Sequence, residues 1–378
     1  MRITGIVCEY NPLHLGHKKQ IDLLKQQGHA VVCLMSGNFV QRGHPAIFDK
    51  MTRARAAIDC GADLVLELPL PYALSSAEAF ASGGVQILSK ICDNLCFGAE
   101  DADTQKLMQV ANMLLSSEFS EKLPLHLQKG LSFPAARSAA LADCGLDPEI
   151  LATPNNILAV EYCKAIFAQN SPLIPMPIMR QGNYHDVLPD AQNPSATAIR
   201  SLIGQDQDWL DYVPHHAVEA FQNAKTHTLA AGEKAILARL RTMTDDEFQA
   251  LPYGSEGLWR KLMHACRECA DLEEIIANTK SKRYTRTRID RMILCAFLGI
   301  NKETLDTAPP YTRILGFNDT GRSILRSVKD NGYFINIGVS SPDPYGQLEH
   351  RTTALYGLFA DMPDHPDAEH RYRVYYRK

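Results

Sequence analysis

The sequence lacks a long hydrophobic run, an excess of positive charge and an ordered set of cysteines. None of its apolar stretches approaches the roughly 18 residues that a membrane-spanning helix needs. The opening stretch MRITGIVCEYN has a single basic residue and no long apolar core, so it predicts a strand and not a signal peptide. We therefore expect a cytoplasmic protein that does not enter a membrane. The formal net charge of -4 means that a nucleic-acid partner would have to bind a local basic patch.

The ten cysteines form no disulfide or zinc framework. Cys266 and Cys269 make a Cys-x-x-Cys pair within KLMHACRECADLEE, a stretch with helical periodicity, and only His264 lies near it. A zinc site of the common kind would need a second pair of ligands. We interpret these residues as ordinary reduced helix cysteines and assign no residue to a metal.

What the sequence does contain is enough chain for two domains, with 378 residues of ordinary hydrophobic content. In the first 100 residues, short apolar runs alternate with amphipathic stretches. Strands are predicted at 3–10, 30–36, 63–69 and 94–100, and helices at 17–28, 49–61 and 75–91. This alternation predicts an α/β fold with a parallel, Rossmann-like sheet, which binds ligands at the carboxyl ends of its strands.

The pattern changes further along the chain. Residues 104–170 are mainly helical and are followed by a strand-like run at 172–180, and helical segments dominate after about residue 205. We predict an α/β domain at residues 1–205 and a mainly helical domain at 206–378, with strand-like runs near its end.

Two histidines follow the first predicted strand, in YNPLHLGHKKQ. His14 and His17 bracket Gly16 at the start of a helix, where helix amides and the helix dipole suit a phosphate. Glycine permits close approach of a ligand to the backbone, and two imidazoles at this spacing can donate to one anion. The arrangement suits transfer at an α-phosphate, which needs fixed donors for developing charge. The alternatives are two solvent-facing loop residues, or two zinc ligands that lack a partner.

A second polar element, NPSATAIRSLI, also opens a predicted helix after a strand. The hydroxyls of Ser195 and Thr197 could hold the outer phosphates of a nucleotide while Arg200 neutralises their charge. The alternative is a plain helix cap by Ser195 with Arg200 in solvent.

The densest basic cluster of the chain is KSKRYTRTRIDR, with one acid, Asp290, within it. Its cations could bind RNA phosphates, and its tyrosine could stack on an unpaired base. The alternatives are a solvated helix start, or ion pairs with the acids of DLEEI. The residues that we predict to bind RNA are Lys280, Lys282, Arg283, Tyr284, Arg286, Arg288 and Arg291.

These segments resemble known families. YNPLHLGH is similar to the His-x-Gly-His signature of the nucleotidyltransferase superfamily, which includes class I aminoacyl-tRNA synthetases, and NPSATAIR resembles its second signature. A longer set resembles the bacterial tRNA(Met) cytidine acetate ligases: GIVCEYNPLHLGH, LMSGNFVQRGHPAIFDKMTRARAAIDCGADLVLELP, CFGAE, PNNILAVEY and YTRTRIDR. Cys8 departs slightly from the pattern of this family, in which a small residue such as alanine is more familiar, and it is expected to pack into the sheet.

The resemblance implies a two-step reaction. Acetate and ATP would give acetyl-adenylate and pyrophosphate, and the acetyl group would then pass to the exocyclic amine of the wobble cytidine of elongator tRNA(Met), giving N4-acetylcytidine. Catalytic roles fall on His14 and His17, and Mg²⁺ would accompany ATP. The implied ATP-binding residues are Val7, Cys8, Glu9, Tyr10, Asn11, Pro12, Leu13, His14, Leu15, Gly16, His17, Lys18, Lys19, Gln20, Gly98, Asn156, Arg180, Gln181, Ser195, Thr197 and Arg200.

Some alternatives stay open from the sequence. Asn155 competes with Asn156 as the nucleotide contact. Arg42, Asp49 and Lys50 either shape the acetate pocket or close over ATP, or else form a solvated loop and helix cap. The competing functions are a small-molecule nucleotide adenylyltransferase or acid–amine ligase of the same superfamily, and a non-enzymatic RNA-binding protein. No stable protein partner is implied.

Overall fold

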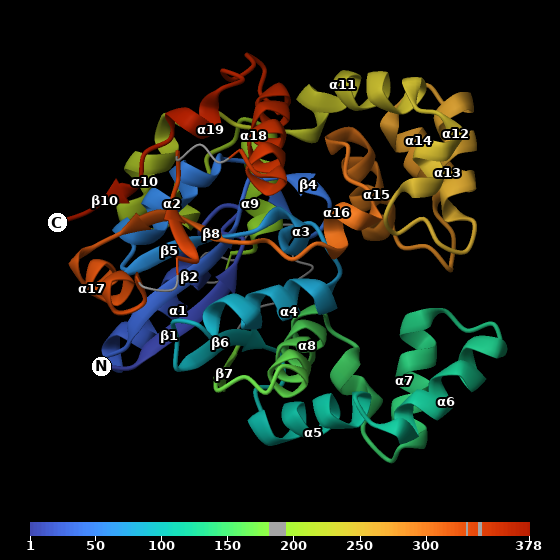
Figure 1. Cartoon of the computed structure of the whole chain (residues 1–378), viewed down its shortest axis with the longest axis horizontal. Helices are drawn as coiled ribbons and strands as arrows, with labels where there is room; N and C mark the ends of the chain where they lie inside the picture. The colour runs from blue at the N-terminus through green and yellow to red at the C-terminus, as the bar shows by residue number, and fades with distance from the viewer. Residues whose placement is uncertain (181–193, 330–331, 339–341) are drawn as a thin grey trace.

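The protein is described from a computed structural model that covers residues 1–180, 194–329, 332–338 and 342–378. Its centre is an eight-stranded sheet with the order β10-β8-β5-β2-β1-β6-β7, and β9 also pairs with β8, at Thr312–Ile314 (Figure 1). The strands of this sheet are β1 Ile3–Cys8, β2 Ala30–Ser36, β5 Leu64–Leu68, β6 Asn94–Ala99, β7 Ile174–Met179, β8 Thr312–Phe317, β9 Phe334–Asn336 and β10 Tyr375–Tyr376.

The five strands that the first half of the chain contributes to this sheet are all parallel, as the alternating pattern predicts. β1 lies between β2 and β6, in a register that runs from Ile3 opposite Ala30 to Cys8 opposite Met35. The chain order reverses on the two sides of β1, so the carboxyl end of β1 is the switch point at which such sheets bind ligands. A two-stranded hairpin, β3 Phe39–Val40 and β4 His44–Pro45, follows β2 outside the sheet.

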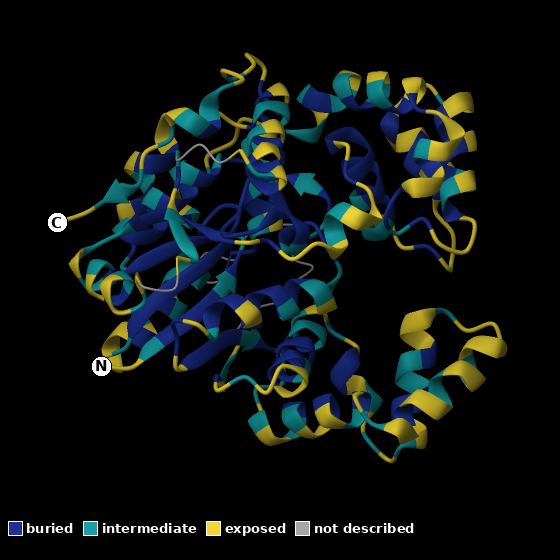
Figure 2. Ribbon diagram, viewed as in Figure 1, coloured by how far each residue is buried: buried dark blue, intermediate teal, exposed yellow. Residues whose placement is uncertain are grey.

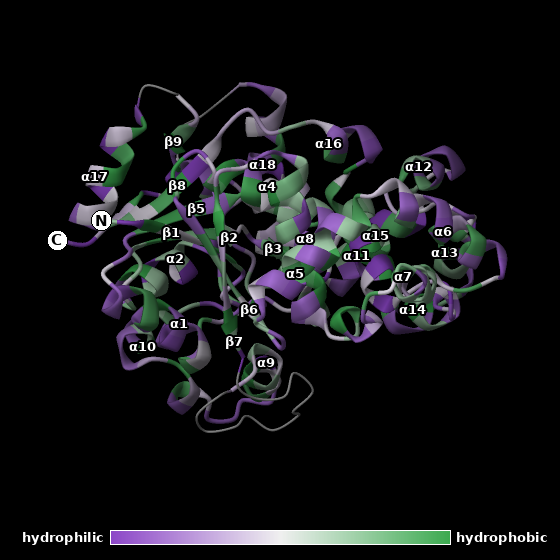
Figure 3. Cartoon of the chain, turned by 90° about the horizontal axis from the view of Figure 1, so that it is seen from below, coloured by the Kyte–Doolittle hydropathy of each residue, from purple (hydrophilic) through white to green (hydrophobic). Residues whose placement is uncertain are grey.

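Helices cover both faces of the sheet, as Figure 3 shows for α1, α2 and α10 on one side. This face packs on a core that includes Ile21, Val31, Ala57 and Phe221, whereas α4, α5 and α8 cover the other face. The helices of the first 204 residues are α1 Leu15–Gln26, α2 Lys50–Asp59, α3 Leu70–Ala73, α4 Ala77–Leu88, α5 Thr104–Leu114, α6 Ser117–Gln128, α7 Phe133–Asp143, α8 Pro154–Ala168 and α9 Ala196–Gly204, with a 3-10 turn at Pro148–Leu151.

The second half of the chain builds a separate helical core and also extends the sheet. Helices α11, α13, α14, α15 and α18 enclose this core, which includes Ile236, Leu262 and Phe297. Figure 2 shows its inner faces buried and its outer faces exposed. The helices of this half are α10 His215–Gln222, α11 Leu229–Thr242, α12 Asp245–Ala250, α13 Leu258–Glu268, α14 Leu272–Thr279, α15 Arg286–Leu298, α16 Lys302–Asp306, α17 Asp319–Ser327, α18 Pro344–Tyr356 and α19 Ala368–Arg371, with 3-10 turns at Leu210–Tyr212 and Gly357–Phe359.

The boundary at residue 205 stays a prediction, and the structure shows how closely the two ranges are joined. β8 pairs antiparallel with β5, so three strands of the second range belong to the sheet of the first. The stretch KLMHACRECADLEE, which has helical periodicity, is divided between two helices, with a break after α13 at Cys269. No helix among the described residues is long and apolar enough to cross a membrane.

Candidate functional site: the loop after the first strand

Four sequence motifs meet at the carboxyl edge of the parallel sheet. The loop after β1 carries His14 and His17, β6 ends at Gly98 and Ala99, and Arg180 directly follows β7. Arg200 on α9 reaches the same loop, because its Nη1 donates to the carbonyl oxygen of Asn11 at 2.6 Å. Sequence elements almost 190 residues apart therefore form one site.

His14 and His17 have fixed hydrogen-bond roles. Nδ1 of His14 accepts a hydrogen bond from the backbone N–H of Gly16 at 3.1 Å, and so caps α1. Nδ1 of His17 accepts from the backbone N–H of His14 at 3.3 Å. A nitrogen that accepts carries no proton, so in each neutral imidazole the proton is on Nε2. Both residues therefore present an Nε2–H donor.

The two imidazoles are neutral at ordinary pH. Their rings stack with centroids 3.7 Å apart and an interplanar angle of 25°. Burial, with the charges of Arg180 and Arg200 adding to it, lowers the pKa of His14 to about 3. Burial, His14 and Arg180 likewise lower the pKa of His17 well below its ordinary value. Two arginines thus supply the positive charge of the site, and the histidines act as uncharged donors.

The second motif, NPSATAIRSLI, is partly a helix cap, which was the alternative that the sequence left open. Oγ of Ser195 accepts from the N–H of Ala198 at 3.1 Å at the start of α9. Arg200, however, is not left in solvent: besides the carbonyl of Asn11, its Nη2 donates to Oγ1 of Thr197 at 3.1 Å. Arg200 therefore fastens α9 to the loop after β1.

Asn155 and Asn156 separate into two roles. Oδ1 of the buried Asn156 accepts from the N–H groups of Glu100 and Asp101, both at 2.9 Å, so its side chain stabilises the turn after β6. Oδ1 of Asn155 accepts from Nη1 of Arg180 at 3.0 Å. Asn155 is therefore the asparagine that lies beside Arg180, although the sequence favoured Asn156.

Gly98 makes room for Arg180. A Cβ at residue 98 would lie 3.0 Å from Cγ of Arg180, which is tighter than ordinary contact. The carboxylate of Glu100 accepts from Thr153, Asn155 and the N–H of Asn156, and these bonds lower its pKa although burial acts in the opposite direction. The network holds Asn155, and through it Arg180, at the strand ends.

Several of the other residues predicted in the first loop are used within the fold. Cys8 packs into the sheet as expected, and Tyr10 and Leu13 are buried. Lys18 pairs with Asp22, and Nε2 of Gln20 donates to Sγ of Cys96 at 3.2 Å. Gln181, also predicted to bind ATP, lies outside the described residues.

Sequence reasoning missed Arg53, which fixes the ends of β1 and β2. Its fully buried guanidinium donates to the carbonyl oxygens of Glu9 at 2.7 Å and of Ser36 at 3.0 Å, and also to those of Gly37 and Phe48. The signal is its place in the apolar stripe of α2, where positions 50, 53, 54, 57 and 58 are all buried.

Lys50 is held within the fold by buried carboxylates and does not lie in a solvated loop. Its Nζ lies 2.8 Å from carboxylate oxygens of Glu67 and of Glu369, and 3.9 Å from Glu349, all of them buried. These carboxylates hold the pKa of Lys50 above its ordinary value against the opposing effect of burial. Asp49 is the cap of α2, since its Oδ1 accepts from the N–H groups of Met51 and Thr52.

The basic cluster lies at α14–α15, and most of its side chains already have partners. Arg286 forms a two-pronged ion pair with Glu273 at 2.6 Å, and Arg283 pairs with Glu256 at 2.9 Å. Tyr284 is buried and its OH donates to the carbonyl of Glu256, so stacking on a base would require its ring to move. Arg288 bonds to the carbonyl of Tyr253, whereas the side chains of Lys280 and Lys282 are exposed.

The β3–β4 hairpin connects this cluster to the site. Nη1 of Arg291 donates to the carbonyl of Gln41 at 3.3 Å, and Nε2 of His44 lies 3.7 Å from Oδ2 of Asp290. At Gly43, whose φ is +84°, a Cβ would lie 2.4 Å from the backbone nitrogen of Arg291. The hairpin therefore packs backbone against backbone on α15, and places the basic cluster beside the loop region of the site.

Comparisons with known proteins agree with this geometry. The family model described as "HIGH Nucleotidyl Transferase" matches residues 1–369. A tRNA(Met) cytidine acetate ligase of Clostridium novyi is 41% identical, with 87% of this chain and 88% of that protein covered. One of Clostridium perfringens is 36% identical, with 95% of each chain covered.

Solved structures are similar over the whole chain. Thermotoga maritima TmcAL in its apo form superposes with a TM-score of 0.91 at 28% identity, over 100% of this chain and 99% of that one. The same protein bound with alpha-thio ATP gives a TM-score of 0.88 at 28% identity, with the same coverage. The α/β nucleotidyltransferase fold predicted from the sequence is thereby confirmed, and the chain belongs to the tRNA(Met) cytidine acetate ligase family.

Proposed function

We propose that this chain is an ATP-dependent ligase that activates acetate as acetyl-adenylate and transfers the acetyl group to the wobble cytidine of elongator tRNA(Met). Membership of the ligase family supports the activity, and a relative of the same fold binds an ATP analogue. The structural observation that carries the proposal is the pair of neutral, Nε2-protonated histidines at the switch point of the sheet. Because its substrates are ATP and tRNA, the proposed reaction belongs in the cytoplasm.

In the first step, an acetate oxygen attacks the α-phosphorus of ATP and pyrophosphate leaves. Negative charge develops on the phosphoryl oxygens, and His14 and His17 donate to it through Nε2. Arg180 and Arg200 supply positive charge from two sides of the loop. Mg²⁺ would accompany ATP and would screen the charge of its phosphates.

In the second step, the exocyclic amine of cytidine attacks the acetyl carbon, AMP leaves and the amine loses a proton. This amine is a weak nucleophile because its lone pair is delocalised into the ring, so an activated acyl donor is needed. The residues described at the site offer positioning and hydrogen-bond donors for this step, without a covalent enzyme intermediate.

The tRNA is proposed to bind the basic cluster, with Lys280 and Lys282 as the exposed cations. The ion-paired Arg283 and Arg286 can exchange their carboxylate partners for phosphates at small cost, since exposed ion pairs contribute little. The contact of the β3–β4 hairpin with α15 then brings the acceptor base toward the adenylate.

Exchange of labelled pyrophosphate into ATP, measured with a panel of small carboxylates, tests the first step. We expect exchange that depends on acetate, followed by transfer of labelled acetate to tRNA(Met). Exchange without transfer would favour a small-molecule ligase, and absence of both signals would contradict the proposal.

A further inference from the structure

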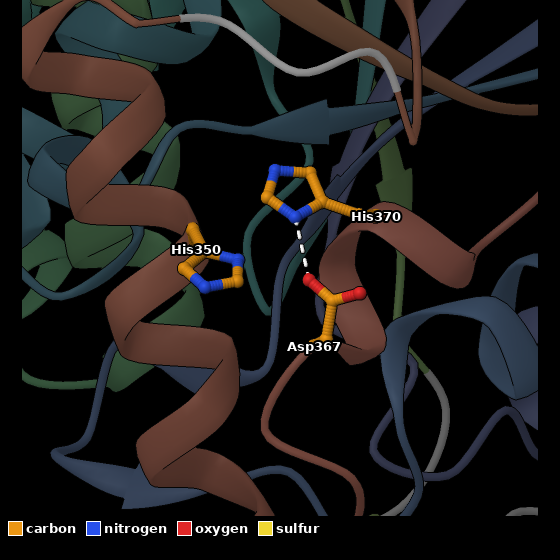
Figure 4. A group of neighbouring side chains, drawn as sticks. All are labelled: His350, Asp367 and His370. Carbon is orange, nitrogen blue, oxygen red and sulfur yellow. Dashed lines mark hydrogen bonds and ion pairs between the residues drawn. The ribbon is translucent and has the colours of Figure 1, made fainter.

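Two helices near the end of the chain bring a cluster of nitrogen and oxygen ligands together, away from the site described above. His350 lies on α18, whereas Asp367 and His370 lie at α19. In Figure 4 the three side chains point toward one another across the gap between these helices. One ligand atom from each residue lies within 4.8 Å of the other two.

The chemistry of this set suits a transition metal. Two imidazoles and one carboxylate are ligands that zinc accepts at about 2.0–2.2 Å, which places tetrahedral ligands about 3.4 Å apart. Nδ1 of His370 and Oδ1 of Asp367 are already 2.7 Å apart, and the two imidazole rings are stacked with centroids 4.4 Å apart. Shifts of about 1 Å in the side chains would suffice to close the set on an ion.

An orphaned nitrogen is the second observation. Nδ1 of His350 is buried and has no hydrogen-bond partner among the described residues. Buried polar atoms are almost always satisfied, so an unpaired ring nitrogen beside two further ligands indicates a missing partner. With the proton on Nε2, Nδ1 is an acceptor that a proton-bearing donor or a cation would satisfy, and the carboxylate of Asp367 favours the cation.

We propose that His350, Asp367 and His370 bind one divalent transition-metal ion of the zinc type, with water in the fourth position. This inference is independent of the proposed ligase reaction. The three ligands span 17 and 3 residues of sequence, a spacing outside the short paired motifs by which zinc sites are usually found.

The ion would act as a clamp between α18 and α19. Glu369, next to His370, contacts Lys50 of α2 at 2.8 Å and accepts a hydrogen bond from Oγ1 of Thr353 on α18 at 2.7 Å. Holding α19 against α18 therefore also holds the carboxylate that neutralises Lys50. The metal would thereby stabilise the attachment of the C-terminal segment to the first half of the chain.

Without metal, the cluster is a local ion pair. Asp367 pairs with His370, and Nε of Arg371 lies 3.9 Å from Oδ2 of Asp367. This pair needs neither His350 nor an ion. The dependence of binding on His350 therefore distinguishes the clamp from the ion pair.

The test is titration of the chelator-treated full-length protein with ZnCl2 by calorimetry, and with CoCl2 by visible absorption. We expect one ion per chain, a rise in Tm of several degrees, and cobalt bands of tetrahedral nitrogen and oxygen coordination. In the His350→Gln/His370→Gln variant we expect at least tenfold weaker binding and no rise in Tm. The His216→Gln variant, altered on the exposed face of α10, serves as the matched control and should bind as the wild type does.

Three results would overturn the proposal: no stoichiometric binding by the wild type, equal binding by the double variant, or cobalt-to-thiolate charge-transfer bands, which would assign the ion to cysteines. Circular dichroism of each variant before titration verifies its fold. The single variant His350→Gln keeps the Asp367–His370 pair and should alone weaken binding.

Discussion

His14 combines two functions that the sequence motif does not separate. Its Nδ1 caps α1, which leaves Nε2 available to donate to a ligand. Burial and two arginines keep the ring uncharged, with a pKa of about 3. A neutral donor needs no counter-charge in the resting site, and it retains its proton while phosphate charge develops.

This shifted pKa has a consequence for stability. The unfolded chain binds a proton at His14 below about pH 6.5, whereas the folded chain does so only near pH 3. The contribution of the neutral His14 to the stability of the fold is therefore complete above about pH 6.5 and is lost as the pH falls toward 3. Between pH 7 and pH 5, the free energy of unfolding of the wild type should fall by about 2 kcal/mol because of His14.

Urea denaturation of the wild type and of His14→Asn at pH 7 and pH 5 measures this difference. Asparagine is a good helix cap but does not titrate, so it preserves the acceptor and removes the pH effect. The wild type should lose more free energy of unfolding than the variant on acidification. An equal loss in both proteins would show that His14 is protonated freely in the folded state.

Sequence reasoning selected residues that the fold brings together, but it did not separate the structural roles of their side chains. The histidines, Arg180 and Arg200 do meet, because each lies at a strand end or helix start that the alternating pattern predicts. Asn156 and Tyr284 are different, because their side chains are used within the fold: one holds a turn and the other is buried. Such choices depend on neighbours that are distant in the sequence.

Helix α2 places two charged side chains in the protein core. Lys50 and Arg53 lie in its apolar stripe, one bound by three carboxylates and the other by backbone carbonyls. Burial and the neighbouring Glu349 and Glu369 raise the pKa of Glu67, so this cluster shares a proton among its carboxylates. Lys50 and Arg313, whose Nε lies 3.3 Å from a carboxylate oxygen of Glu369, neutralise the charge that remains.

Replacing Lys50 with Met should therefore be costly. The change removes the one described cation that faces all three buried carboxylates, and we expect the free energy of unfolding to fall by about 3–5 kcal/mol. Glu67→Gln, which keeps an acceptor for Lys50, should cost about 1 kcal/mol or less. Thermal and urea unfolding compare the two; a Lys50→Met protein as stable as the wild type would refute the assigned role of the cluster.

The start of α15 and the loop before it should bind tRNA through the exposed lysines. Lys280→Ala and Lys282→Ala should each weaken tRNA binding several-fold at low salt and reduce the salt slope by about 1. Lys90, exposed beyond the carboxyl end of α4 and near the amino end of β6, gives the matched control Lys90→Ala. Binding isotherms at several salt concentrations measure the slope, and the same slope in all four proteins would exclude this surface.

The two halves of the chain are connected more closely than the change in sequence pattern near residue 205 suggests. β8 covers the edge of β5, whose residues are all buried in the intact chain. The parallel sheet was predictable because each of its strands is a short apolar run. The antiparallel addition of β8 was not, since its partner lies about 250 residues away and no local pattern specifies that pairing.

A fragment of residues 1–205 should therefore fail as an independent unit. It would expose the edge of β5 and the cluster around Lys50 that Glu349 and Glu369 complete. We expect aggregation, or loss of a cooperative thermal transition, when the fragment is compared with the full chain. A soluble fragment with a cooperative transition would instead support a domain boundary at residue 205.

The central claim is that neutral Nε2–H donors at the first loop promote formation of acetyl-adenylate. Acetate-dependent exchange of pyrophosphate into ATP by His17→Asn tests it most directly, because asparagine retains an acceptor for the N–H of His14 but has no donor at the Nε2 position. We predict a fall in the exchange rate of about 10²- to 10³-fold, partial recovery in His17→Gln, and unchanged tRNA binding in both. Exchange at the wild-type rate in His17→Asn would contradict the account.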